Sequence, residues 1–241
     1  MNRYYFLFLA FLGSVNSMFA SAAPAGSQLS MPGVKHETPA AAPAVKSTVK
    51  LPPLLQEVQA QYQKSSGIEA QFDQITDIRA TKQVKKAKGR IWIKRPNKLR
   101  WETLEPDPNI LVSDGKTFWF YTPPYEKDER GQVIIKKTAQ VQTQFLNSLL
   151  SGSFDFEKGA ASVESRSANV FLLRPRAGTA GDVKVAQITI EPAKHTISEV
   201  LLTHTSGNQT QIRLKEINLH PKLEDQLFRF VPDRNTDKIF E

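Results

Sequence analysis

The chain contains 241 residues and no cysteine. This absence excludes disulfide bonds, thiol catalysis, cysteine-based zinc sites and a lipid anchor on an N-terminal cysteine. Long apolar runs are also lacking. The best candidate, YYFLFLAFLG at residues 4–13, is shorter than the ~20 residues that a membrane-spanning helix needs. No other stretch approaches a span, so we expect a protein that is not embedded in a membrane.

Motifs for catalysis are absent as well. The patterns HExxH, GxSxG and the P-loop do not occur, and the four histidines are scattered along the chain. A hairpin turn explains Ser113-Asp114-Gly115 better than a nucleophile does. Asp155 and Glu157 alternate with two phenylalanines, which indicates a half-exposed strand rather than an acid/base pair. We therefore expect no enzymatic activity, no catalytic residue, no cofactor and no metal site.

Residues 1–22 are typical of a secretory signal peptide. Arg3 supplies the positive start, residues 4–13 the apolar core, and Ala20-Ser21-Ala22 an A-x-A cleavage pattern. Residues 23–50 are rich in proline, alanine and serine, contain no aromatic residue, and cannot bury enough surface to fold. We interpret them as a disordered tether, and residues 51–241 as one folded domain outside the cytoplasm.

Positive charge is in excess. The sequence has 32 lysines and arginines against 24 aspartates and glutamates, which gives a formal net charge of +8. Removal of residues 1–22 takes away only Arg3 and leaves +7. Such an excess favours an anionic partner: nucleic acid, an acidic protein face or a membrane surface. Export makes nucleic acid the least expected of the three, and the charge does not choose between the other two.

Apolar periodicity predicts two helices. The first begins at Pro52-Pro53, where a helix start tolerates proline, and ends near Gly67, with apolar residues at spacings of four, three and four. The second covers residues 141–152, and Phe145 and Leu149 lie on its apolar stripe. Both are expected to be amphipathic, with one face turned toward a core.

The rest of the domain is predicted to form strands. Asp114-Gly115 gives the strongest hairpin signal, and apolar residues alternate through most of the remaining segments. We expect strands at 68–72, two that meet at Pro96-Asn97, two around Asp114-Gly115, and others at 132–137, 168–174, 183–190, 197–204, 209–215 and 227–232. Roughly ten antiparallel strands of this kind indicate a large curled sheet or barrel.

The stretch IWIKRP at residues 91–96 carries an arginine in line with two isoleucines. In a strand, Ile91, Ile93 and Arg95 share one face, and Trp92 points the other way. This stretch and FWFY at 118–121 are apolar on both faces. Each side must therefore be covered, or one side must face an apolar guest. A large curved sheet with few helices can enclose a guest on its concave side.

A set of residues recurs at fixed spacing in the segment 89–124: Gly89, Trp92, Arg95-Pro96, Trp101, Ser113-Asp114-Gly115 and Trp119 to Tyr121. With this pattern the segment closely resembles the outer-membrane lipoprotein carrier protein (LolA) family. The likeness is weaker over residues 51–232, where it includes TQFLNSLL in the second helix and FRFVP near the end.

The resemblance implies a mainly β (α+β) fold, an incomplete antiparallel β-barrel of about ten or eleven strands with a helical lid over a concave apolar cavity. It implies a monomeric periplasmic chaperone that binds the acyl chains of lipoproteins released from the inner membrane and delivers them to the outer membrane. The implied partners are acylated lipoproteins, an inner-membrane lipoprotein-releasing ABC transporter and an outer-membrane lipoprotein receptor, with no nucleic acid.

Two alternatives stay open. One is a lipid-binding or envelope-stress-sensing module with the same half-barrel fold. The other is a structural protein whose basic surface binds anionic envelope polymers.

Two departures from the family are also visible, since the tether at 23–50 is longer than usual and VPDRNTDKIFE at the end lacks a glycine often found there. The second departure leaves open whether the chain has the C-terminal hook of some members.

The resemblance also assigns roles to residues. Arg95 matches the family arginine thought to hold the lid closed, and its guanidinium can donate to backbone carbonyls. For residues 118–121 either phase fits the pattern, and we choose Phe118 and Phe120 as the inward pair. The expected lining of the acyl-chain cavity is then Ile91, Ile93, Leu99, Trp101, Phe118, Phe120, Phe145 and Leu149.

Overall fold

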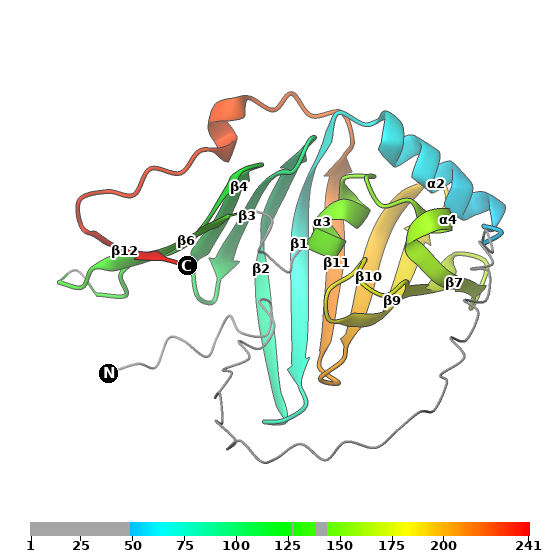
Figure 1. Cartoon of the computed structure of the whole chain (residues 1–241), viewed down its shortest axis with the longest axis horizontal. Coiled ribbons are helices and arrows are strands. Elements are labelled where there is room, and N and C mark those ends of the chain that lie inside the picture. Colours follow the sequence, from blue (N-terminus) through cyan, green and yellow to red (C-terminus); the bar gives the residue numbers. More distant parts are fainter. Residues whose placement is uncertain (1–48, 127, 138–143) are drawn as a thin grey trace, which may run out of the picture.

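Twelve strands pair into one sheet in the part of the chain that the computed structural model describes, residues 49–126, 128–137 and 144–241. Their order across the sheet is β12-β6-β5-β4-β3-β2-β1-β11-β10-β9-β8-β7. Neighbouring strands are antiparallel, except that β12 runs parallel to β6. The sheet is open, because β12 and β7 form its two edges (Figure 1).

Two meanders build this sheet and join where β1 pairs with β11. The first consists of β1 (Gly67–Ile78), β2 (Gln83–Lys94), β3 (Lys98–Glu105), β4 (Asn109–Asp114), β5 (Thr117–Thr122) and β6 (Gly131–Lys137). The second consists of β7 (Ala160–Ser165), β8 (Val170–Pro175), β9 (Val183–Glu191), β10 (Thr196–His204) and β11 (Gln209–Asn218), and β12 (Thr236–Phe240) follows at the C-terminus.

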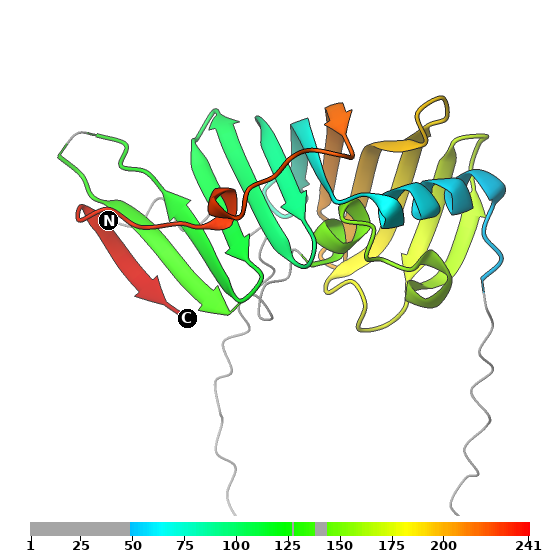
Figure 2. The ribbon, with the colours of Figure 1, turned by 90° about the horizontal axis from the view of Figure 1, so that it is seen from above.

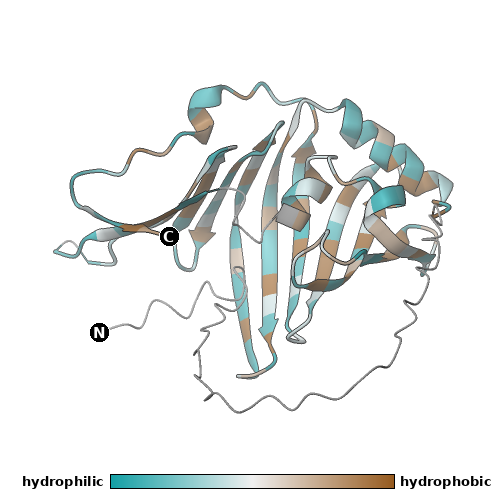
Figure 3. Cartoon of the chain, in the orientation of Figure 1, coloured by the Kyte–Doolittle hydropathy of each residue, from teal (hydrophilic) through white to brown (hydrophobic). Residues whose placement is uncertain are grey.

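Three helices lie over one face of the half-sheet made by β1 and β11 to β7 (Figures 1 and 2). They are α2 (Pro53–Lys64), α3 (Gln144–Leu150) and α4 (Phe156–Gly159). Apolar and polar bands alternate along the strands, which is the pattern of a sheet with one face on a core (Figure 3). The inward residues of both meanders and the apolar stripes of the helices form one continuous buried cluster.

The predicted closing strand at residues 227–232 is wrong. The segment begins within a short 3₁₀ helix, η2 (Asp225–Phe228), and continues as extended chain that pairs with no strand. The alternation in FRFVP has another cause, because Phe228 is fully buried and the ring of Phe230 lies 5.0 Å from that of Tyr121. The true last strand, β12, comes later, and β7 was not predicted. The sheet therefore has twelve strands in the described residues rather than about ten or eleven.

The strand predicted around Asp155 and Glu157 is also wrong. Asp155 is the N-cap of α4, and its carboxylate accepts hydrogen bonds from the backbone N–H groups of Glu157 and Lys158 at 3.0 and 3.1 Å. The apolar alternation arises because Phe154 and Phe156 both turn into the core from this cap. Asp155 therefore has a structural role, as a helix cap.

Parts of the sequence interpretation fall outside the described residues. The predicted signal peptide, the tether up to residue 48 and the first residues of the helix predicted at 141–152 all lie there. The domain boundaries at 22, 50 and 51 stay predictions.

Candidate functional site

Two neighbouring rows of side chains cross the inner face of β2, β3, β4 and β5. Residues paired directly across antiparallel strands share a face. The rows are Ile93–Leu99–Ser113–Phe118 and Ile91–Trp101–Leu111–Phe120. All eight side chains are at most 8% exposed. Six of them are the strand residues predicted to line an acyl-chain cavity, and Phe118 and Phe120 are the buried pair of the 118–121 stretch.

Ser113 is the polar member of these rows. Its hydroxyl donates to the carbonyl oxygen of Asn97 at 3.3 Å and accepts from the backbone N–H of Gly115 at 3.1 Å. The serine thus connects the β2–β3 turn, which contains Asn97, with the β4–β5 turn, which contains Gly115. Because its polar atom is bonded there, Ser113 does not interrupt the apolar character of the wall.

The two helix residues predicted for the site belong to the same buried cluster. Phe145 and Leu149 of α3 are each 2% exposed. The ring of Phe145 packs edge-on against Phe154 at 5.2 Å, and Phe154 packs in the same way against Phe156 at 5.5 Å. The inner-face rows and the helices thus belong to one buried apolar cluster.

Helix α2 adds Leu55, Val58 and Tyr62 to that cluster and is fastened by a few polar contacts. The hydroxyl of Tyr62 accepts the backbone N–H of Ile197 at 3.0 Å, and burial raises the pKa of this phenol well above its usual value. Gln59 accepts the N–H of Phe156 at 2.8 Å. These bonds tie α2 to β10 and α4, so the helices form one covering layer.

Arg95 lies in the turn between β2 and β3 and is half-buried. In the described residues its guanidinium makes no hydrogen bond and no ion pair, while its neighbours on both strands do. Its role in holding the lid closed stays a prediction.

The neighbours of Arg95 hold the C-terminal segment. Asp225 of η2 accepts from Lys94 at 2.7 Å and from Lys98 at 2.8 Å, and these two lysines lower the pKa of its carboxyl to about 2. Lys94 also donates to the carbonyl of Leu223, and Arg100 to that of Leu227. We call residues 220–235 the C-terminal strap. It runs along the rim of the sheet from β11 to β12 (Figure 2).

The strap explains why FWFY is apolar on both faces. Arg100, Val112 and Trp119 pair in one row on the face opposite the main core. Val112 and Phe228 are both fully buried but lie outside the main core cluster. The outer face of β3 to β5 is therefore covered by the strap. Sequence reasoning missed this, because the alternation at 227–232 looked like a strand.

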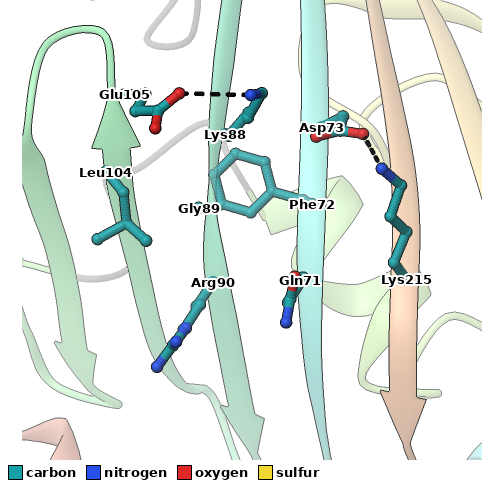
Figure 4. A pocket seen from close by; sticks show the side chains of 9 residues that line it. All are labelled: Gln71, Phe72, Asp73, Lys88, Gly89, Arg90, Leu104, Glu105 and Lys215. Carbon is teal, nitrogen blue, oxygen red and sulfur yellow. Dashed lines mark hydrogen bonds and ion pairs between the residues drawn. The ribbon is translucent and has the colours of Figure 1, made fainter.

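A separate pocket of about 200 Å³ lies beside β1, β2, β3 and β11 (Figure 4). Its lining is mostly charged and none of the eight predicted cavity residues belongs to it. Two ion pairs flank it, Lys88 with Glu105 at 3.4 Å and Lys215 with Asp73. The lining consists of Gln71, Phe72, Asp73, Lys88, Gly89, Arg90, Leu104, Glu105 and Lys215.

Among the described residues no helix is both long enough and apolar enough to cross a membrane. The sequence profile of the family described as outer membrane lipoprotein carrier protein LolA matches residues 63–231. The outer-membrane lipoprotein carrier protein of Dechloromonas aromatica is 29% identical over 174 residues, which are 72% of this chain and 81% of the relative. That of Erwinia tasmaniensis is 29% identical over 180 residues, 74% of this chain and 83% of the relative.

Among solved structures, a LolA superfamily protein from Nitrosomonas europaea matches with a TM-score of 0.42 and 9% identity. The match covers 73% of this chain and 97% of that chain.

Proposed function

The chain belongs to the outer membrane lipoprotein carrier protein family, LolA, and from this membership we propose that it is a periplasmic carrier of acylated lipoproteins. The cargo leaves the inner membrane through an ABC transporter and is passed to a receptor at the outer membrane. The observation that carries the proposal is the continuous apolar cluster between the inner face of the sheet and the three helices.

A carrier of this kind lowers the free-energy cost of moving acyl chains through water. Each methylene of an acyl chain that enters water costs about 0.8 kcal/mol, so a multiply acylated lipoprotein meets a barrier of some tens of kcal/mol. Apolar walls that bury the acyl chains about as well as a membrane does remove the barrier. Walls that bind the chains much more strongly would trap the cargo. A covering layer joined by apolar packing and a few hydrogen bonds suits repeated opening.

We propose that the acyl chains insert between the two inner-face rows and α3 when the covering layer opens. Ile91, Ile93, Leu99, Trp101, Phe118, Phe120, Phe145 and Leu149 are the residues proposed to contact them. Arg95 is proposed to hold the covering layer closed until cargo enters, because an arginine offers five donors on a planar group.

Release of lipoproteins from spheroplasts tests the proposal. We expect newly made lipoproteins to appear in the soluble fraction, bound to the purified protein, when it is added. Leu149→Glu should abolish this, because it places a charge in the apolar cluster. The matched control is Val231→Glu, since Val231 is 87% exposed and the same charge there meets water. Recovery of phospholipid but no lipoprotein would show a lipid-binding module instead of a carrier.

A further inference from the structure

The segment RATKQVKKAKGR, residues 79–90, contains six cations and no acid. It forms the turn between β1 and β2 and the first two-thirds of β2. A chain with a net charge of +8 thus concentrates six positive charges in twelve residues. Such a concentration creates a local field that the same charges spread over the surface would not.

Most of these cations make no ion pair with the described residues. Lys88 pairs with Glu105 at 3.4 Å. For the other five, the described residues provide no ion pair: Arg79, Lys82, Lys85, Lys86 and Arg90. Arg79, Lys82, Lys86 and Arg90 are exposed to solvent, and Lys85 is half-exposed. Their charge is therefore available to a partner.

The fold projects this charge away from the body of the sheet. The β1–β2 pairing runs to Ile78 and Gln83, whereas β3 pairs with β2 only as far as Lys88. In the described chain, the start of β2 thus has no neighbour on its β3 side. Figure 1 shows the β1–β2 hairpin extending beyond the ends of β3 and β4. The projecting part, residues 78–87, is called the cationic hairpin end.

Cations lie on both faces of the cationic hairpin end. Lys85 pairs with Thr76 and lies on the inner face, whereas Lys86 pairs with Ile75 and lies on the outer face. Val84 lies on the outer face with Lys86 and is 60% exposed. Because β1 pairs with β11 as far as Asp77, only the turn and the β2 edge of the hairpin end are free. Cations on both faces of this edge together with an exposed apolar side chain suit a soft charged layer that the turn can enter. A flat protein face would meet only one side of it.

We propose that the cationic hairpin end docks on the surface of a lipid bilayer that contains anionic phospholipids. Lysines on flexible stems act as point charges and suit a diffuse layer of phosphates better than a fixed array of carboxylates. Val84 would enter the interfacial region of the headgroups. This docking goes beyond the proposed carrier function and needs no bound cargo.

Such docking would fix the orientation of the protein. Strand β2 is 12 residues long, so the hairpin end and the β2–β3 turn that holds Arg95 are roughly 35–40 Å apart. A membrane bound by the hairpin end would leave Arg95 and the strap on the far side. The rim of the sheet would then stay accessible to protein partners.

Sedimentation with vesicles tests the proposal. The purified, cargo-free protein is mixed with phosphatidylcholine vesicles or with vesicles that also contain phosphatidylglycerol, at low and at high salt. We expect binding only to the anionic vesicles and loss of that binding at high salt. Substitution of Lys82, Lys85 and Lys86 by glutamine should weaken it at least about tenfold, because each cation near the surface adds to the attraction.

The matched control substitutes Lys116, Lys222 and Lys238 by glutamine, which removes the same charge from other exposed positions. This control should bind as the unsubstituted protein does. Equal loss in both variants would overturn the proposal, because net charge alone would then explain binding. Unchanged vesicle binding in the hairpin variant would also overturn it. If that variant in addition transfers cargo more slowly, the hairpin end contacts a protein.

Discussion

The hydroxyl of Tyr62 on α2 accepts the backbone N–H of Ile197 on β10 at 3.0 Å. The pairing of β9 and β10 changes register between Ile197 and Glu199, so the tyrosine binds a backbone group at an irregularity of the sheet. Because the tyrosine is 2% exposed and Ile197 1%, water cannot take over this bond. The contact ties the covering helix to the sheet at one defined point.

Tyr62→Phe should lower the free energy of unfolding by about 1–3 kcal/mol, because it leaves the buried N–H of Ile197 without an acceptor. The same change at Tyr125, which is 80% exposed, serves as the control and should have no effect. Urea denaturation measures both. Equal stability of the two variants would mean that the sheet irregularity does not depend on α2.

The carboxyl of Asp225 should titrate at about pH 2, well below its ordinary value of 3.8, because Lys94 and Lys98 both donate to it. Since the pKa is lower in the folded state, the contact stabilises the strap above about pH 4 and is lost as the pH falls toward 2. The carboxyl carbon shift of Asp225, followed by NMR, measures the midpoint. A midpoint near 3.8 would contradict the two contacts.

Asp225→Asn should loosen the strap at neutral pH without unfolding the sheet, because the amide cannot pair electrostatically with the two lysines. Protease cleavage within residues 220–235 should become faster than in the unsubstituted protein. Asp233→Asn is the control, since in the described residues Asp233 accepts bonds only from Asn235 and Thr236, its near neighbours at the end of the strap. Equal cleavage of the two variants would show that other contacts hold the strap.

The sequence predicted the first helix, most strands and the buried phase of Phe118 and Phe120 because their patterns depend on local periodicity. The strap could not be predicted in the same way. Phe228 and Phe230 alternate as strand residues do, but η2, which contains Phe228, lies against β3 and β4, and Phe230 lies against Tyr121 of β5, all far away in the sequence. The strand predicted at Asp155 was wrong for a related reason. Between two phenylalanines, a helix-capping residue and a strand residue give the same alternation of apolar and polar side chains.

Gly152→Ala should destabilise the protein by about 2–3 kcal/mol. The glycine has a φ of +72°, and a Cβ there would lie 2.6 Å from the carbonyl carbon and oxygen of Tyr62. Gly178→Ala separates the two causes, because Gly178 has a φ of +79° and no atom within 4 Å of such a Cβ. It should cost about 1 kcal/mol, for the backbone alone. Similar losses in urea denaturation would rule out a tight approach of α2 to Gly152.

Arg95→Leu should give a folded protein with altered uptake or transfer of lipoproteins. The substitution removes five donors from the rim and adds apolar surface beside the inner-face rows, so a covering layer held by Arg95 should open more readily and exchange cargo differently. Uptake of lipoproteins from spheroplasts and their transfer to outer membranes measure the two steps separately.

Arg90→Leu, on the strand that leads into the turn of Arg95, provides the control for this change. Arg90 is exposed on the outer face, and in the described residues it too makes no ion pair, so the substitution alters charge and apolarity equally but away from the covering layer. If Arg95 holds the layer, only the change at residue 95 should alter uptake or transfer. Identical behaviour of the two variants would remove Arg95 from the mechanism, because a rim arginine would then matter no more than one exposed on the opposite face.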